Sequence, residues 1–319
     1  MTDNTPTVLI TGATGGLGRH LAKELVAGGR RVLVHGRDAA RVTRLAAELG
    51  PLAVPFIADL ASLDDVRMLA EEVRYVTGRL DVLVNNAAVG FGPPGQSRQT
   101  SSDGHELRFA VNYLAPVVLT RALLPLLRAT APARVVNIGS VGQAPFEPAE
   151  ATFYDDYNGV VAYRRSKLAL VAHTFDLAEE LRDTGVTVNC LHPAGFMDTA
   201  MVRESRVQPF STVDQGAAPT LRMITDPALE RVTGEYFDGF FPGRALSPAY
   251  DPQFVGTLRK VTDQLVGRVK VPQGVCPYTY AGELPLLDGA LDQAPGGRTA
   301  FRLPAGTLRL PASFGGLSR

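Results

Sequence analysis

The feature that most constrains this chain is an alternation of short β-branched runs with longer amphipathic segments, which continues to about residue 240. Strands separated by helical segments form parallel sheets, because a parallel neighbour cannot be reached through a tight turn. Near-continuous apolar runs such as residues 81–85 are typical of strands buried on both faces. The alternation therefore predicts an α/β fold with a doubly wound parallel sheet of about seven strands.

The expected strands lie at residues 8–10, 31–35, 53–57, 81–85, 134–138, 187–192 and 235–237. The helices expected among them lie at residues 17–27, 39–49, 63–77, 160–182 and 252–266. We divide the chain into a main domain, residues 1–270, and a Pro/Gly-rich C-terminal extension, residues 271–319. The extension shows no periodic apolar pattern long enough to build a core of its own.

Charge and cysteine content exclude several classes of protein. The chain carries 32 Lys and Arg against 32 Asp and Glu, so nothing indicates nucleic acid or an anionic membrane as a partner. Its two cysteines, Cys190 and Cys276, lie far apart, which favours a reducing, cytoplasmic location over a disulfide framework. The polar start does not fit a signal peptide, and we expect no membrane span because no apolar run approaches about 20 residues.

A glycine-rich turn, Thr11-Gly-Ala-Thr-Gly-Gly-Leu-Gly18, separates the first expected strand from the first helix. A glycine cluster often marks only a turn. Between a strand and a helix, however, it lets a pyrophosphate approach the amides at the helix N-terminus, which is the Rossmann arrangement for a dinucleotide. The residues of this turn expected to contact the cofactor are Gly12, Thr14, Gly16, Leu17 and Gly18.

The end of the second strand indicates which dinucleotide is bound. Enzymes that use NAD usually place an acid there to bind the ribose hydroxyls, whereas this chain has Gly36 followed by Arg37. A guanidinium can bind a 2′-phosphate through two hydrogen bonds, so the sequence favours NADP(H). The alternative for Arg37 is a solvated loop charge. The nearby acid, Asp38, fits the N-cap of the following helix better than a ribose ligand.

Further motifs follow the glycine turn in a fixed order. Asp59-Leu60 comes after the third strand, Asn85-Asn-Ala-Ala88 after the fourth, Asn112 lies in Phe109-Ala-Val-Asn-Tyr-Leu, Ser140 closes Asn137-Ile-Gly-Ser, and Tyr163-Arg-Arg-Ser-Lys167 opens a helix. With these motifs the chain resembles, over residues 7–267, the short-chain dehydrogenase/reductase family, in its branch similar to retinol dehydrogenases and WW-domain oxidoreductases.

The resemblance implies further cofactor contacts. Asp59 and Leu60 would flank the adenine, although Asp59 also fits a residue at the start of the next helix. The adenosine ribose would lie beside Asn86, Ala87 and Ala88. The element after the sixth strand supplies Pro193, Phe196 and Thr199, with Thr199 at the nicotinamide carboxamide. One extra residue separates Pro193 from Thr199, compared with the common family pattern.

A tyrosine–lysine pair is expected to carry the catalysis. Reduction of a carbonyl needs a proton donor at the oxygen, and a tyrosine such as Tyr163 donates readily but is a poor base at neutral pH. The charge of Lys167, one helical turn later, is expected to lower the pKa of Tyr163. Lys167 would also hold the nicotinamide ribose, Ser140 would donate a hydrogen bond to the substrate oxygen, and Asn112 would bind a water in a proton relay. The alternative for Ser140 is a serine that only caps a helix or forms a turn, and the alternative for Asn112 is an ordinary helix asparagine.

Other candidate residues have simpler explanations. Tyr154 and Tyr157 lack a lysine four residues on, so neither can form the pair. Cys190 and His192 are two potential ligands, too few for a zinc site, and no metal is expected. Arg164 and Arg165 lie beside the pair and fit a solvated helix face, with recognition of an acidic substrate as the alternative.

Three loops are expected to surround the substrate, at residues 89–100, 141–158 and 196–212. Their aromatic and apolar residues favour a lipophilic or aromatic carbonyl or alcohol; they are Phe91, Phe146, Phe153, Tyr154, Phe196, Met197, Met201 and Phe210. Two rival functions remain open on this scaffold: an epimerase or dehydratase that retains NADP, and a non-catalytic NADP-binding protein. A homo-oligomer also remains open.

The extension carries the first testable prediction. It holds Tyr278, Tyr280, Phe301 and Phe314, apolar surface that is costly to leave in water. We therefore predict that it packs on the main domain or on a partner subunit, against the alternative of a solvated segment. Deleting residues 271–319 should then lower the melting temperature or the substrate affinity. Rapid proteolytic trimming to about Gly267 with both quantities unchanged would contradict a packed extension.

Overall fold

The computed structural model describes residues 5–151, 157–267, 292–294 and 298–300. The chain divides into two compact units, Met1–Val271 and Pro272–Arg319. In the second unit the described residues form two short antiparallel strands, β9 (Asp292–Ala294) and β10 (Arg298–Ala300). The predicted packing of the extension concerns residues that lie largely outside the described ranges.

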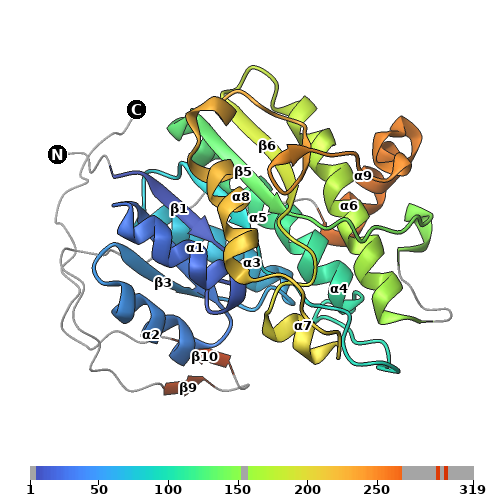
Figure 1. Ribbon diagram of the computed structural model, residues 1–319, viewed down its shortest axis with the longest axis horizontal. Helices are drawn as coiled ribbons and strands as arrows, with labels where there is room; N and C mark the ends of the chain where they lie inside the picture. Colours follow the sequence, from blue (N-terminus) through green and yellow to red (C-terminus); the bar gives the residue numbers. More distant parts are fainter. Residues whose placement is uncertain (1–4, 152–156, 268–291, 295–297, 301–319) are drawn as a thin grey trace, which may run out of the picture. The chain divides into compact units, whose positions relative to one another are not determined.

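An eight-stranded sheet in the order β3-β2-β1-β4-β5-β6-β7-β8 forms the centre of the first unit (Figure 1). The strands are β1 (Thr7–Ile10), β2 (Arg31–Gly36), β3 (Ala53–Ile57), β4 (Val82–Asn85), β5 (Ala133–Ile138), β6 (Val186–His192), β7 (Tyr236–Asp238) and β8 (Phe241–Pro242). All pairs are parallel except β7 with β8. The α/β fold is confirmed, and the seven expected strands match the observed bounds to within one residue.

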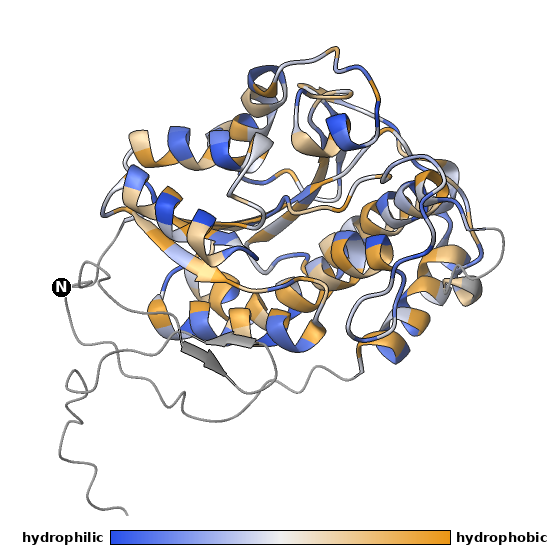
Figure 2. Ribbon diagram, turned by 90° about the horizontal axis from the view of Figure 1, so that it is seen from below, coloured by the Kyte–Doolittle hydropathy of each residue, from blue (hydrophilic) through white to orange (hydrophobic). Residues whose placement is uncertain are grey.

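Helices cover both faces of this sheet. They are α1 (Gly16–Ala27), α2 (Ala39–Leu49), α3 (Leu63–Val76), α4 (Leu107–Phe109), α5 (Ala115–Thr130), α6 (Gly159–Glu180), α7 (Ala200–Glu204), α8 (Val213–Thr225) and α9 (Pro252–Val266). Successive strand residues point to opposite faces, so Leu9 and Leu83 join the core beneath α3, α5 and α6, whereas Ile10 and Val84 join the core beneath α1, α2 and α8. In Figure 2 the helices accordingly alternate between hydrophobic and hydrophilic residues.

The stretch Leu107–Thr130 corrects one expectation. Its 24 residues are long and apolar enough to cross a membrane by length and composition, whereas the sequence had indicated no such run. In the fold, 89% of its most apolar window is buried, and α5 packs against α3 and the sheet. The segment is apolar on nearly all sides because it lies inside the core. It is interrupted by a π-helical turn, Ala110–Leu114, a geometry that often marks functional sites.

The strand order determines where a ligand can bind. Because β1 lies between β2 and β4, the chain turns to opposite sides of the sheet after β1 and after β4. The carboxyl ends of these two neighbouring strands therefore border a crevice, which is the usual ligand position in open α/β sheets. The glycine-rich turn follows β1, and the Asn86 segment follows β4.

Candidate active site

The glycine-rich turn has the backbone that an anion-binding turn requires. Gly12 and Gly16 have φ angles of +67° and +48°, which side chains other than glycine rarely adopt. At Gly18 a Cβ atom would lie 2.4 Å from the carbonyl oxygen of Gly12. The N-cap of α1, Gly15, provides no side-chain hydrogen bond, and the first turn holds no acid. The amides at this helix N-terminus therefore fit a pyrophosphate.

Two neighbours hold the glycine turn in place. The side-chain amide of Asn86 donates to the carbonyl oxygens of Thr11 and Gly12, at 2.8 and 3.3 Å. In return, the Thr11 hydroxyl accepts hydrogen bonds from the backbone N–H groups of Asn86 and Ala87. Asn86 thus supports the turn directly, while Ala87 and Ala88 are half-buried beside it.

His35, which the sequence did not indicate as part of the site, supports the same turn from β2. Its Nδ1 atom accepts the N–H of Gly12 at 3.3 Å, and its Nε2 atom lies 3.2 Å from the carbonyl oxygen of Ala58. This pattern requires a neutral ring with its proton on Nε2. Burial lowers the pKa of His35 to about 4, so the ring keeps this form at neutral pH.

Two arginines lie near the end of β2, Arg37 just after the strand and Arg41 in the first turn of α2, and only Arg37 was predicted. A Cβ at Gly36 would lie 2.8 Å from the Thr14 methyl group, so an acid does not fit there without a shift. Arg37 is exposed. Asp38 is the N-cap of α2, as predicted, and accepts the N–H of Arg41. The Arg41 guanidinium donates to the carbonyl oxygen of Thr14 at 3.1 Å and thus lies on the glycine turn.

Three further residues predicted to contact the cofactor, Leu17, Asp59 and Leu60, differ in their exposure. Leu17 and Leu60 are buried, so only their backbones can face a cofactor. Asp59 is exposed, and its carboxylate accepts the N–H of Ala61. Ser62, rather than Asp59, is the N-cap of α3. Asp59 therefore stabilises the turn before that helix.

Tyr163, Lys167 and Ser140 meet at the carboxyl end of β5. Tyr163 and Lys167 lie on one side of α6, with the Lys167 Nζ atom 5.7 Å from the centre of the Tyr163 ring. The Tyr163 hydroxyl forms a hydrogen bond with the Ser140 side chain. Lys167 is buried and donates to the carbonyl oxygen of Ile138 at 2.7 Å. The structure therefore brings these three predicted side chains together.

The electrostatics differ from the expectation. Burial raises the pKa of Tyr163, and the hydrogen bond with Ser140 lowers it, but Lys167 is not among the groups that set it. The predicted lowering by Lys167 is thus wrong for this arrangement, because desolvation of the phenol outweighs other effects. Burial also lowers the pKa of Lys167 to about 8. The raised pKa keeps the Tyr163 phenol protonated at neutral pH, and its role as proton donor stays a prediction.

Asn112 lies within the π-helical turn and is fully engaged in hydrogen bonds. Its side-chain oxygen accepts the N–H of Val89 at 2.7 Å, and its amide nitrogen donates to the Val89 carbonyl at 3.0 Å and to the Ser166 hydroxyl at 3.1 Å. Asn112 therefore anchors the start of the loop after β4. Its expected part in a proton relay stays a prediction.

Aromatic side chains from two of the expected loops gather beside Tyr163. The Phe91 ring meets the Tyr163 ring edge-on, with their centres 4.7 Å apart. Phe196 lies 6.3 Å from Phe91, and Phe210 lies 5.4 Å from Phe196. Phe196 has a φ of +41°, a strained conformation of the kind that clusters at functional sites. Phe196 was predicted both as a cofactor contact and as a substrate-loop residue; its ring belongs to this aromatic wall, and its contact with the cofactor stays a prediction.

The other loop residues have varied positions. Thr199 packs on the glycine turn, since a Cβ at Gly16 would lie 2.9 Å from its methyl group, and Pro193 is buried. Met201 packs against Gly90 in the same way. Phe146 was expected at the substrate, but it is buried in the core against Phe109 and Phe254. Phe153 and Tyr154 lie outside the described residues.

The remaining candidates from the sequence do not form a site. Cys190 is a buried thiol on β6, and Cys276 lies outside the described residues. Within the described part of the chain, no three His, Cys, Asp or Glu side chains are grouped to hold a metal. Arg164 is exposed on α6, as expected of a solvated face, whereas Arg165 is half-buried.

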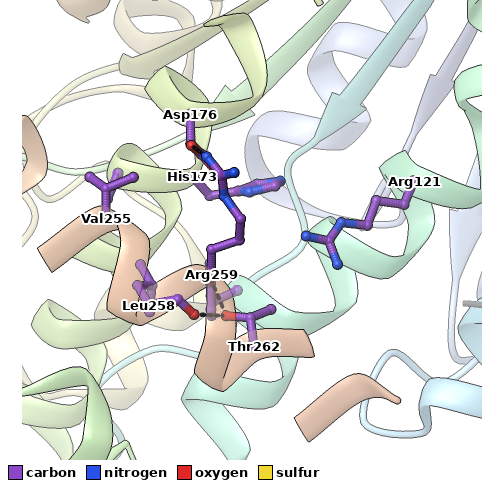
Figure 3. Close-up of a pocket in the computed structure, with 9 residues that line it drawn as sticks. Arg121, His173, Asp176, Val255, Leu258, Arg259 and Thr262 are labelled. Atoms are coloured by element: carbon purple, nitrogen blue, oxygen red, sulfur yellow. Dashed lines mark hydrogen bonds and ion pairs between the residues drawn. The ribbon is translucent and has the colours of Figure 1, made fainter. Parts of the chain in front are cut away.

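A small cavity between α5, α6 and α9 was not indicated by the sequence (Figure 3). It has a volume of about 10 Å³, which is room for one water molecule. The Nε2 atom of His173 is buried there without a hydrogen-bond partner among the described residues. Arg121 and Arg259 also line it, but each is paired with an aspartate. The cavity is too small for a substrate.

Comparison with known proteins agrees with this geometry. A family model described as short chain dehydrogenase matches residues 6–209. Retinol dehydrogenase 14 from Mus musculus is 36% identical over 297 residues, which cover 83% of this chain and 86% of the relative. The chain belongs to the short-chain dehydrogenase family. Its relatives also include human retinol dehydrogenase 14, at 36% identity, which confirms the retinol dehydrogenase branch.

Solved structures share the fold. An uncharacterized protein from Mycobacterium paratuberculosis superposes with a TM-score of 0.68 at 26% identity, over 83% of this chain and 97% of its own. RhlG from Pseudomonas aeruginosa, an active-site complex with NADP, has a TM-score of 0.61 at 29% identity, over 75% and 97%. A 3-ketoacyl-(acyl-carrier-protein) reductase from Brucella melitensis, complexed with NADH, has a TM-score of 0.60 at 24% identity, over 73% and 96%. This short-chain dehydrogenase is therefore a nicotinamide-dependent oxidoreductase.

His35 gives the site a measurable dependence on pH. Its pKa is about 4 in the folded chain and 6.5 as a free side chain, so the stability that it contributes is present above pH 6.5 and is lost as the pH falls to 4. The difference corresponds to about 3 kcal/mol. In urea-unfolding measurements, the free energy of unfolding of His35→Gln should therefore fall less between pH 6.5 and pH 4 than that of the unmodified protein. The surface variant His20→Gln is the control, and equal slopes for His35→Gln and the unmodified protein would contradict the assignment.

Substitutions at Tyr163 and Tyr157 test which of the two tyrosines is the proton donor. Tyr163→Phe should lower the turnover number by at least about 100-fold, the scale of a lost general acid, while cofactor binding stays nearly unchanged. Tyr157→Phe should keep most of the turnover number, because its hydroxyl bonds to Arg108 and Glu106 rather than facing Ser140. Steady-state kinetics checks both variants, and the reverse order of effects would contradict the assignment.

Proposed function

We propose that this short-chain dehydrogenase is an NADP(H)-dependent carbonyl reductase acting on a lipophilic aldehyde or ketone. The observation that carries the proposal is the buried Tyr163 hydroxyl, hydrogen-bonded to Ser140 beside an aromatic wall. A binding protein without catalysis has no need of a buried tyrosine and lysine held at one point. The cytoplasmic location remains a prediction from the sequence.

The cofactor would lie across the carboxyl ends of β1 and β4. The α1 N-terminus would bind its pyrophosphate, and Arg37 with Arg41 would bind a 2′-phosphate on the adenosine ribose. The absence of an acid at Gly36, with Arg37 next to it and Arg41 in the first turn of α2, supports NADP(H) over NAD(H). Lys167 would hold the nicotinamide ribose, since two of its three ammonium protons remain beyond the one donated to Ile138.

The residues of the site would then divide the reaction among them. When bound, NADPH would supply the hydride for the carbonyl carbon, and negative charge would develop on the carbonyl oxygen. Tyr163 donates its proton to that oxygen, and Ser140 stabilises the developing charge with a hydrogen bond. Because burial raises the pKa of Tyr163, the phenol holds its proton at neutral pH and can act as the acid in this step. Solvent returns the proton to Tyr163 after turnover.

The proposed substrate class rests on the aromatic wall beside Tyr163. Phe91, Phe196 and Phe210 offer aromatic surface, and 38% of Phe196 and 72% of Phe210 remain exposed. An apolar body next to the carbonyl would cover this surface, gaining about 25 cal/mol per Å² buried. The relatives named retinol dehydrogenases are consistent with a lipophilic substrate.

Arg37 and Arg41 provide the test of the cofactor. Each of Arg37→Ala and Arg41→Ala should weaken NADPH binding by about 1–3 kcal/mol, the scale of a charge-assisted hydrogen bond, and leave NADH binding nearly unchanged. Arg44→Ala, on the same helix and also exposed, is the matched control. Fluorescence titration of both cofactors measures the effect. Equal affinities of the unmodified protein for NADPH and NADH would contradict the proposal.

A further inference from the structure

Another buried cation, besides Lys167, donates a hydrogen bond to the backbone of Phe91, the residue whose ring meets Tyr163 edge-on. Arg108, in α4, is completely buried, and the neighbouring Glu106 is 1% exposed. A buried ion pair contributes little net stability compared with an apolar pair of similar size, because both charges lose their hydration. The hydrogen bonds that the pair makes therefore indicate its role better than its contribution to stability does.

The Arg108 guanidinium uses all five of its N–H groups. The Nε atom donates to the Gly90 carbonyl at 2.8 Å, and Nη2 donates to the Phe91 carbonyl at 2.8 Å and to Gln96 Oε1 at 3.0 Å. The Nη1 atom donates to the Tyr157 hydroxyl at 2.6 Å and to Glu106 at 3.4 Å. Three of the five acceptors thus belong to the loop after β4.

Glu106 accepts two further hydrogen bonds in this network, in addition to the one from Arg108. Its Oε1 atom accepts the Tyr157 hydroxyl at 2.8 Å, and its Oε2 atom accepts the N–H of Phe109 at 2.7 Å, which caps α4. Tyr157 lies just before α6, the helix that carries Tyr163. The network therefore joins the loop after β4 to the start of the catalytic helix.

Arg108 and Asn112 together hold three consecutive residues of this loop. Asn112 binds both backbone groups of Val89, and Arg108 binds the carbonyls of Gly90 and Phe91. Phe91 is the residue whose ring meets Tyr163 edge-on. Backbone anchoring at this point therefore determines where the Phe91 ring lies against the Tyr163 ring.

The packing around the network leaves little freedom. A Cβ at Gly159 would lie 2.3 Å from the Phe91 carbonyl oxygen, and one at Gly92 would lie 2.7 Å from Arg108 Nη2. The loop backbone and the guanidinium thus approach each other as closely as glycine permits. Lysine cannot replace this fork, because its three donors on one atom cannot reach five separated acceptors.

We infer that Arg108 is a positioning residue that, through the backbone of Gly90 and Phe91, sets the aromatic wall beside Tyr163 and thereby selects among carbonyl substrates by size. This inference rests on the proposed carbonyl reduction. Its structural half, the anchoring of residues 89–96, does not depend on any activity.

The test compares Arg108→Lys with Arg134→Lys. Arg134 also donates to two backbone carbonyls, those of Met223 and Asp226, but it lies at the opposite, amino end of β5. In Arg108→Lys, hydrogen exchange in peptides covering residues 89–96 should accelerate at least tenfold. The KM for cinnamaldehyde should rise at least tenfold and that for propanal less than threefold, with the NADPH KM within twofold. Arg134→Lys should change none of these.

Several outcomes separate the possibilities. Unchanged exchange in Arg108→Lys, or the same changes in Arg134→Lys, would overturn the inference. If Arg108→Lys does not fold, Gln96→Ala, which removes one acceptor on the loop, should produce a smaller shift in the same direction, and no shift would overturn it. If the unmodified protein reduces neither aldehyde, the proposed function fails, while the exchange measurement still decides the anchoring.

Discussion

The hydrogen bonds between the turn after β4 and the glycine turn after β1 determine where the rest of the site lies. Asn86 and Thr11 exchange four of them across the two strand ends, counting the backbone groups of Ala87 and Gly12. His35 holds the Gly12 amide from the other side. Arg41 and Thr199 both contact this fixed turn, which leads into the N-terminus of α1.

The segment Leu107–Leu114 serves the core and the site together. Its apolar side chains, such as Phe109 and Leu114, are buried beneath the sheet. Its polar side chains, Arg108 and Asn112, turn the other way and anchor the loop that carries Phe91. A regular α-helix continuing into α5 would repeat every 3.6 residues. The π-helical turn at Ala110–Leu114 changes this spacing in the segment that both buries apolar side chains and anchors the loop.

Local spacing was sufficient to predict the strands, the glycine turn, the Asp38 cap and the Tyr163–Lys167 pair. Contacts between distant segments were not predictable in this way. Arg108 reaches Tyr157 across 49 positions, and His35 reaches Gly12 across 23, with no motif to indicate either. Phe146 has the composition of a substrate residue but lies in the core. The sequence led us to expect a lowered pKa for Tyr163. Burial instead raises this pKa, and burial is a property of the fold that local spacing does not indicate.

Transfer of a labelled hydride tests the central claim, that this site moves a hydride between nicotinamide and a carbonyl carbon. The protein would be incubated with NADPH deuterated at the transferring position of nicotinamide C4, prepared in both stereochemical forms, and a panel of aldehydes and ketones. Reduction predicts one deuterium on the carbonyl carbon of an alcohol product from one of the two forms, and none from D₂O. Deuterium retained on the cofactor from both forms, or product labelled at that carbon only from solvent, would contradict it.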